Sequence, residues 1–275
     1  MSNTDTNTAT PPARNPANVQ TVDFARHGKL RVKPSPGFAH AKDRHVVAIN
    51  VSELGITSSN FPVVLVQSPR DKRYTLVAML GLKSGENVFY GEEFWESCYV
   101  PMAVQRHPFV VGYDDRQKES AELAPCIEID SPCISETDGM ALFQSDGTPT
   151  DMLRSVSQTL RMMFESGKFT DQFIRKLEEL QLIAPFELIL QAQNGDLNRV
   201  TGMATIDEKK LKALSAEQLK DLQTHDFLAP CHLMLVSLYQ LNQLIRRRNR
   251  LGGQQQITSF RIEFADEKAA AAANA

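Results

Sequence analysis

The sequence predicts an α+β fold, in which an antiparallel sheet from the N-terminal half packs against helices of the C-terminal half. In residues 21–147, short runs of β-branched and aromatic residues are separated by turn residues at intervals of roughly ten to fifteen positions, as in an antiparallel meander. After residue 148, apolar residues recur with the spacing of amphipathic helices. One hairpin signal, Asn194-Gly195, interrupts the helical half, so we expect some strands there as well.

The chain length, the hydrophobic content and the composition of the two ends predict one continuous domain between two tails. The chain has 275 residues, of which 42% are hydrophobic, enough for a sizeable core. Residues 1–20 are rich in Thr, Asn, Pro and Ala and have almost nothing to bury, so we expect a disordered tail. We expect 21–147 to be a strand-rich half, 148–264 a helix-rich half with a hairpin, and 265–275 a frayed tail.

The strands of the N-terminal half are expected in short apolar runs that end at charged or turn residues. The run that begins at Tyr74 ends at Gly81, and the residues after Gly85 look like the returning strand of a hairpin. The strand candidates are 30–32, 46–49, 63–66, 74–80, 88–90, 109–113, 126–130 and 141–144.

The C-terminal half begins with a helix start at Thr148. The sequence Thr148-Pro149-Thr150-Asp151 combines a Thr cap, Pro at the first helical position and an early acidic residue. Gly167 ends the apolar spacing and Thr170 resumes it, which predicts two successive helices before Pro185.

The remaining elements follow from turn and capping signals. Asn194-Gly195 joins two expected hairpin strands, and Asp207 and Ser215 are expected to cap short helices. A long helix is expected over 230–251, and the alternating residues 257–264 predict a last strand. The apolar side of the long helix is expected to carry Leu233, Val236, Leu241 and Leu244.

Charge, cysteine content and apolar run length narrow the class of protein. The 30 basic and 33 acidic residues give a net charge of −3, so we do not expect nucleic acid as a partner. The four Cys residues form no C-x-x-C pair, which favours free thiols in a reducing compartment. The sequence shows no secretory pattern and no apolar run of the roughly 20 residues that a membrane span needs. We therefore expect a cytoplasmic protein without a transmembrane segment.

Motifs for catalysis, metal binding and cofactor binding are missing from the sequence. It contains no G-x-S-x-G, Walker or G-x-G-x-x-G pattern, and its six His residues have no metal-binding spacing. We therefore predict no catalytic residues, no metal site and no cofactor, and the balance favours a protein that is not an enzyme. The basic cluster 246–250 is either a phosphate or nucleic-acid patch or a complement to a helix dipole, and the slightly acidic chain favours the second.

The segment 74–113 holds the candidate binding surface. It contains the only Trp together with Tyr and Arg residues, and these three residue types dominate interface hot spots. Two interpretations are open: a groove for a partner or ligand, and a packed core, because aromatic side chains bury large areas. The candidate partner- or ligand-binding residues are Phe89, Trp95, Tyr99, Arg106, His107 and Phe109.

A resemblance to a known family rests on the order and spacing of several short motifs. They are Phe61-Pro62-Val63-Val64-Leu65, Gly81-Leu82, Gly85-Glu86-Asn87-Val88-Phe89, Trp95, Tyr99-Val100-Pro101, Pro108-Phe109, Leu142-Phe143, Asp146-Gly147-Thr148-Pro149 and the region of Gly202. Together they resemble the SapC family, the S-layer-related proteins of Gram-negative bacteria, over roughly residues 45–244. The family has no established catalytic residues that this sequence would inherit.

The resemblance implies a non-catalytic accessory or adaptor protein linked to surface-layer or outer-membrane nutrient-uptake systems. We expect such a protein to bind a protein partner through the aromatic stretch. The alternative is an enzyme or small-molecule-binding subunit that acts with a flavin-dependent tryptophan-halogenase-like partner. A deep cavity at Trp95, Tyr99, Arg106 and His107 would favour the alternative, and a flat exposed aromatic patch would favour the adaptor. The sequence leaves the oligomeric state open.

Overall fold

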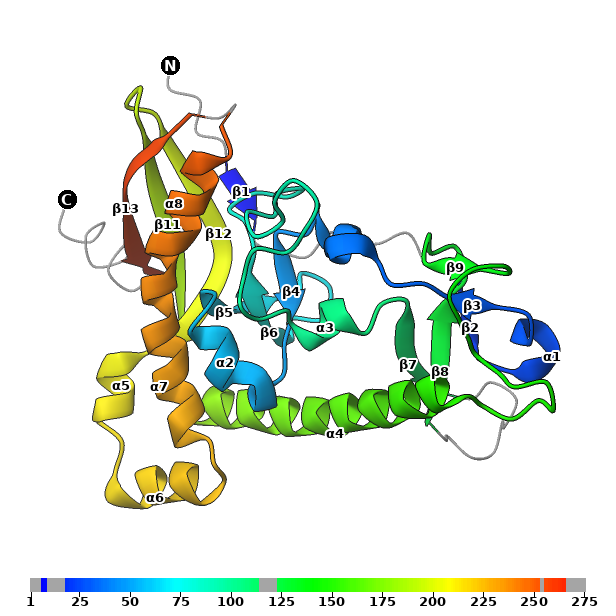
Figure 1. Cartoon of the computed structure of the whole chain (residues 1–275). Helices are drawn as coiled ribbons and strands as arrows, with labels where there is room; N and C mark the ends of the chain where they lie inside the picture. Colours follow the sequence, from blue (N-terminus) through cyan, green and yellow to red (C-terminus); the bar gives the residue numbers. More distant parts are fainter. Residues whose placement is uncertain (1–5, 9–17, 114–122, 253–254, 266–275) are drawn as a thin grey trace.

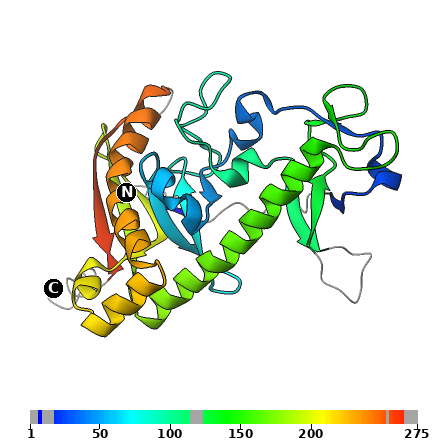
Figure 2. The same ribbon diagram turned by 60° about the horizontal axis from the view of Figure 1, so that its bottom comes forward.

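A computed structural model of the chain describes residues 6–8, 18–113, 123–252 and 255–265. The main sheet stands at one end of the molecule and two small sheets stand at the other (Figure 1). The long helix α4 (Asp151–Glu179) runs from the small sheets to the main sheet, as Figure 2 shows from a second direction.

The main sheet draws strands from both halves of the chain. In spatial order, its strands are β13 (Ile257–Phe264), β11 (Ile183–Ala192), β12 (Leu197–Ile206), β5 (Val63–Gln67), β6 (Tyr74–Met79) and β4 (Val46–Ala48). Neighbours along this path are antiparallel, while β1 (Thr6–Thr8) pairs with β12 in parallel. β5 and β12 join the two halves by pairing Val66 with Met203 and Leu65 with Ala204.

The predicted α+β class is confirmed, and helices of the C-terminal half pack on the sheet. Helix α7 (Leu228–Ser237) contacts both β5 and β12, at the centre of the sheet. The hairpin signal Asn194-Gly195 also lies where the sequence placed it, between β11 and β12, with Gly195 at a φ of 90° that suits a residue without a Cβ. Local turn chemistry therefore specified the longest strand pair correctly.

Two small sheets build a second core beside the main one. They are β2 (Val19–Thr21), β8 (Leu123–Glu128) and β7 (Phe109–Tyr113), and β10 (Met140–Ala141), β3 (Arg31–Val32) and β9 (Ile134–Ser135). Both cores use α4: Phe173 and Leu177 are buried in the main core, and Leu153 and Leu160 are buried in the second. The single helix therefore ties the two ends of the molecule together.

Helix α4 is continuous where the sequence predicted two helices. Its cap is Thr150 and not Thr148, and it passes through Gly167 without a break. The helix crosses this glycine because a loop of the N-terminal half docks beside it: Val51 N donates to Thr170 Oγ1 at 3.0 Å. Tertiary contacts of this kind outweigh the cost of roughly 1 kcal/mol for a helical glycine.

The other helices are short, and several begin at the predicted caps. Asp207 caps α5 (Glu208–Lys212), and Ser215 opens α6 (Ala216–Thr224) with the predicted capping box. The long helix expected over 230–251 is divided into α7, the 3-10 turn η3 (Leu238–Gln240) and α8 (Leu241–Arg250). The remaining helical segments are α1 (Phe24–His27), η1 (Pro36–Ala41), η2 (Val51–Glu53), α2 (Leu54–Ser58) and α3 (Met102–Gln105).

The predicted returning strand at 88–90 is wrong. β6 pairs with β5 on one side and with β4 on the other, so no edge of β6 is left for these residues. Instead, Val88 N donates to Leu80 O at 2.8 Å, and the chain turns back through an isolated bridge between Tyr90 and Trp95. Strand propensity alone does not say which sheet edge is available.

The two predicted tails lie mostly outside the described residues. Of residues 1–20, the structure describes 6–8, which form β1, and 18–20, of which the last two begin β2. Of 265–275 it describes Ala265 alone. The tail predictions therefore stay predictions, and β1 is an element that the sequence did not indicate.

Candidate functional site

Three rings of the predicted aromatic surface are in the protein interior. Phe89, Trp95 and Phe109 are only 2%, 9% and 4% exposed. Phe61 packs edge-on against Phe89 with ring centroids 4.6 Å apart, and Trp95 Nε1 donates to Tyr99 O at 2.8 Å. These three rings are therefore packed in the core, as the second interpretation of this stretch proposed. Binding of a partner through them stays a prediction.

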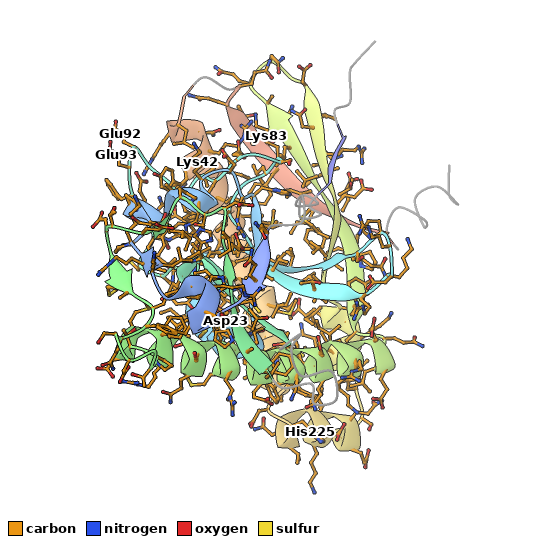
Figure 3. All side chains as sticks on the ribbon, turned by 90° about the vertical axis from the view of Figure 1, so that its right-hand side faces the viewer. Asp23, Lys42, Lys83, Glu92, Glu93 and His225 are labelled. Carbon is orange, nitrogen blue, oxygen red and sulfur yellow. The ribbon has the colours of Figure 1, made fainter. Side chains whose placement is uncertain are left out.

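The solvent side of the same stretch is acidic. Glu92, Glu93 and Phe94 are exposed, with Phe94 58% exposed. Figure 3 shows Glu92 and Glu93 at the outer margin of the molecule. The exposed residues of this stretch therefore include Glu92, Glu93 and Phe94, while the candidate residues Tyr99 and Arg106 are half-buried.

Tyr99 is held by a buried acid, Glu53. The Tyr99 hydroxyl donates to Glu53 Oε2 at 2.7 Å, and Met102 N donates to the same oxygen at 3.0 Å. Asn50 N donates to Glu53 Oε1 at 3.0 Å. Burial and the hydrogen bond to Glu53 raise the pKa of Tyr99 above its ordinary value, so the phenol stays neutral and acts as a structural donor.

Two arginines of the basic cluster on α8 contact residues 86–96 of the aromatic stretch. The Arg247 guanidinium lies 4.9 Å from the centroid of the Phe89 ring, and its Nη1 is 3.2 Å from Glu96 Oε2. Arg248 Nε is 3.3 Å from Oε1 of the buried Glu86, whose Oε2 accepts from Leu82 N at 2.8 Å. Arg247 and Arg248 lie in the last turn of α8, where the dipole interpretation places them, and their side chains are also engaged in these contacts within the chain.

His107 lies at the junction of the two cores. Its ring stacks on His40 with centroids 4.0 Å apart, and His40 Nε2 is 3.0 Å from Val104 O. His107 Nε2 is 2.8 Å from Ser131 Oγ, and its Nδ1 is 3.8 Å from Glu128 Oε2. The stack connects η1 with the segment that enters the small sheets.

The Ser131, His107 and Glu128 side chains have the residue types of a hydrolytic triad but not its geometry. The 3.8 Å between His107 Nδ1 and Glu128 is too long for a hydrogen bond, and Ser131 is 9% exposed. Ser131 Oγ also accepts from Cys133 N at 3.1 Å, as in a local turn. Arg106 donates to Phe109 O at 3.0 Å, so it too acts on the local backbone.

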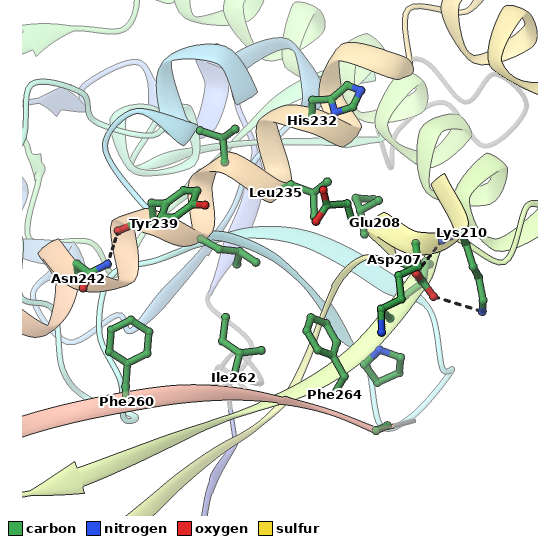
Figure 4. Close-up of a pocket in the computed structure, with 18 residues that line it drawn as sticks. Asp207, Glu208, Lys210, His232, Leu235, Tyr239, Asn242, Phe260, Ile262 and Phe264 are labelled. Carbon is green, nitrogen blue, oxygen red and sulfur yellow. Dashed lines mark hydrogen bonds and ion pairs between the residues drawn. The ribbon is translucent and has the colours of Figure 1, made fainter. Parts of the chain in front are cut away.

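A groove of about 750 Å³ lies between the face of β13 and the helical segment α7–η3 (Figure 4). Phe260, Ile262 and Phe264 project from β13 and form its floor, opposite Leu235 and Tyr239. Helix α5 closes one end. The groove is lined by Ile183, Ala184, Pro185, Ile206, Asp207, Glu208, Lys209, Lys210, His232, Leu235, Val236, Leu238, Tyr239, Asn242, Phe260, Ile262, Phe264 and Ala265.

Polar groups at the ends of the groove are paired within the chain. Asp207 Oδ1 accepts from Lys210 N at 3.0 Å, and its Oδ2 is 3.6 Å from Lys210 Nζ. Glu208 is paired with Lys212 at 2.6 Å, and this hydrogen bond lowers the pKa of the Glu208 carboxyl. At the other end Asn242 donates to Tyr239 O at 3.2 Å. The middle of the groove therefore offers apolar surface and few polar contacts.

Two large apolar side chains stand open to solvent on the helical lip of the groove. Tyr239 is 76% exposed and Val236 is 58% exposed. The sequence prediction that Val236 lies on the apolar side is wrong, because η3 divides the expected helix and residues of α7 and α8 do not follow one continuous helical face. Of the predicted set, Leu241 and Leu244 are buried and Leu233 is half-buried. The signal was present in the spacing of Val236 and Tyr239, which are three residues apart and so share a helical face.

The outer edge of β13 is part of the same surface. In the described part of the chain, β13 is the last strand of the main sheet and pairs only with β11. The Asn249 side chain occupies this edge at Ile257, the first residue of β13. It donates to Ile257 O at 2.9 Å and accepts from Ile257 N at 3.0 Å. We call residues 258–264 of β13, together with Val236 and Tyr239, the β13 surface.

The described residues also bear on metal sites, membrane-spanning helices and disulfide bonds. Among them, no group of three His, Cys, Asp or Glu side chains could hold a metal ion. No helix in the described ranges is long and apolar enough to cross a bilayer. The four cysteines are free thiols, of which Cys98 is exposed and the other three are buried.

Comparison with known proteins identifies one family. The SapC family model matches residues 22–244, which is most of the chain. No curated protein and no solved structure matches it.

Proposed function

This protein belongs to the SapC family, and from that premise we propose that it is a non-catalytic accessory protein that works by binding another protein chain. The link to surface-layer or outer-membrane nutrient-uptake systems is part of this proposal and rests on the family resemblance. We assign the binding to the β13 surface in place of the aromatic stretch, whose principal rings are in the core.

The β13 surface carries the proposal because it joins three features of protein interfaces. Within the described residues it has a strand edge that pairs with no other strand, an apolar groove beside that edge, and a Tyr that is 76% exposed on the lip. An exposed, apolar edge strand favours pairing with another chain. Each 100 Å² of apolar surface that a partner covers there contributes about 2.5 kcal/mol before the costs of association.

A second candidate function is small-molecule binding, the alternative that involves a flavin-dependent tryptophan-halogenase-like partner. The groove volume of about 750 Å³ favours it, because ligand pockets usually measure about 300–1,000 Å³. The groove opens along a strand edge, however, and this geometry suits a chain with a backbone better than a compact ligand.

Quantitative affinity purification from the cells that make the protein tests the proposal. Tyr239→Ser changes the lip of the groove at an exposed position, so the fold should persist. We expect its partner to be lost by about tenfold or more, because an exposed Tyr in an interface behaves as a hot spot. Met162→Ser on α4 is the matched control, since Met162 is 59% exposed and distant in the fold.

Phe94→Ser separates the two binding surfaces. Phe94 is the exposed ring of the aromatic stretch, so this variant should retain the partner if the β13 surface binds it. Loss of the partner with Phe94→Ser and its retention with Tyr239→Ser would transfer the function to the aromatic stretch. If a small molecule occupies the groove, Tyr239→Ser would lose a ligand detected by native mass spectrometry and keep every protein.

A further inference from the structure

We infer that the chain bound at the β13 surface is a second copy of this protein, paired antiparallel to β13 about a two-fold axis at Ile262. The inference rests on the proposed function, because it names the partner of the same surface. It follows from the part of β13 that is open, from the pattern of side chains on its two faces, and from the charges that this pattern places opposite one another.

The open part of β13 in the described structure spans residues 258–264. Asn249 occupies the edge at Ile257, so pairing with another strand is restricted to the residues that follow. The strand ends at Phe264, and Ala265 is the last residue that the structure describes after it. An axis at Ile262 pairs residues 260–264 of the two copies, and all of these residues lie within this span.

The groove face of β13 complements itself in this arrangement. An axis at Ile262 places Phe260 opposite Phe264 of the second copy, and Ile262 opposite Ile262 of the second copy. Directly opposite residues of an antiparallel pair lie on the same face, with Cβ atoms about 4.5–5.5 Å apart. Aromatic pairs of this kind stabilise strand pairing, and here they would continue the apolar floor from one copy to the next.

The polar face selects the same register through charge. An axis at Ile262 places Arg261 of each copy opposite Glu263 of the other, which makes two pairs of opposite charge. An axis at Arg261 would instead place the Arg261 residues of the two copies opposite each other. An axis at Glu263 would place the two Glu263 residues opposite each other. Like charges directly opposite are destabilising, so the neighbouring registers are disfavoured.

Both charged residues are already positioned on that face. Arg261 Nε lies 2.7 Å from Glu263 Oε1 within the strand, and Arg199 of β12 approaches Glu263 Oε2 at 3.5 Å. Pairing of two copies extends this row of charges across the axis. The network then contains both signs on each side of the axis.

The helical lip supplies the rest of the contact. A stable interface covers about 800 Å² of each partner, which is more than one strand pair provides. Val236 and Tyr239 line the groove above the same strand and are exposed. Two copies would bring both lips to the axis, where these side chains cover the shared floor.

Sedimentation velocity of the full chain over a wide concentration range tests the inference, with a charge swap as the register-specific variant. The wild type should form dimers, while Arg261→Glu and Glu263→Arg each place like charges across the axis and should weaken dimerisation by about tenfold or more. The double variant with both substitutions should recover dimerisation. Met162→Glu controls for surface charge, and thermal unfolding checks that each variant is folded.

The outcomes separate this inference from the proposed function. A monomer at every concentration, or a dimer that ignores both charge reversals, overturns the inference. If in that case Tyr239→Ser still releases a different protein in affinity purification, the proposed function stands without it. If Tyr239→Ser releases nothing and no dimer forms, both are wrong.

Discussion

At the scale of single residues, Glu53 organises the segment that the sequence marked as functional. Its two oxygens accept from Asn50 N, Tyr99 Oη and Met102 N, so one carboxyl connects the start of η2 with the loop that leads into α3. Glu53 is 3% exposed. A buried acid with these donors is costly to disturb, because each lost partner leaves a polar atom without water.

Tyr99→Phe removes one of these donors and keeps the ring. We expect the free energy of unfolding to fall by about 1–2 kcal/mol, since the Glu53 oxygen loses its hydroxyl partner while the packing stays. Urea unfolding at neutral pH measures the change. Tyr90→Phe is the matched control and should stay within about 0.5 kcal/mol of the wild type; equal losses in both variants would contradict the role of Glu53.

The same hydrogen bond makes a prediction about pH. Burial and Glu53 raise the pKa of Tyr99 in the folded protein above its ordinary value of 10.0. A raised folded-state pKa gives stability that is complete below the unfolded-state pKa and is lost as pH rises toward the folded-state value. The stability difference between wild type and Tyr99→Phe should therefore shrink above pH 10, whereas a constant difference up to higher pH would contradict it.

At the scale of elements, α4 is the clearest case in which long-range contacts override a local signal. A Cβ added at Gly167 would meet only Asn50 Oδ1, at 3.9 Å, so the site has room for a side chain. Gly167→Ala should therefore raise the free energy of unfolding by about 0.5–1 kcal/mol, because alanine favours the helix. Urea unfolding checks this, and a loss of stability would indicate a break at this position, as the sequence predicted.

Elements with a complete local signal were predictable from the sequence. The turn at Asn194-Gly195, the caps Asp207 and Ser215, and the alternation of 257–264 each contain their own physical cause, and each element is found where expected. The strand at 88–90 failed because the edges of β6 were already taken, which depends on β4 and β5 elsewhere in the chain.

The candidate site was less predictable for the same reason. Composition located the aromatic residues, but it could not say that Phe89 and Trp95 pack with Phe61 in the core. The alternation of residues 257–264 predicted a last strand, and the structure shows that Phe260, Ile262 and Phe264 of this strand line an open groove. Whether an apolar face meets a helix or solvent depends on how the whole chain packs.

At the scale of the whole molecule, the main sheet ends in two edge strands with different surroundings. β4 lies at one end and β13 at the other. β4 has three residues, of which two are buried, whereas β13 has eight residues and borders the groove. Short edges resist pairing and long apolar ones favour it, so the fold itself distinguishes the edge that we assign to binding.

Amide hydrogen exchange in the lysate of its own cells, compared between the wild-type chain and Tyr239→Ser, tests the central claim that the β13 surface binds protein. Peptides that cover 258–264 should exchange more slowly in the wild type, because a bound strand or chain protects the outward amides, and peptides that cover β4 should exchange equally in both proteins. Equal exchange at 258–264 in both proteins, or protection that appears at β4 instead, would contradict the claim.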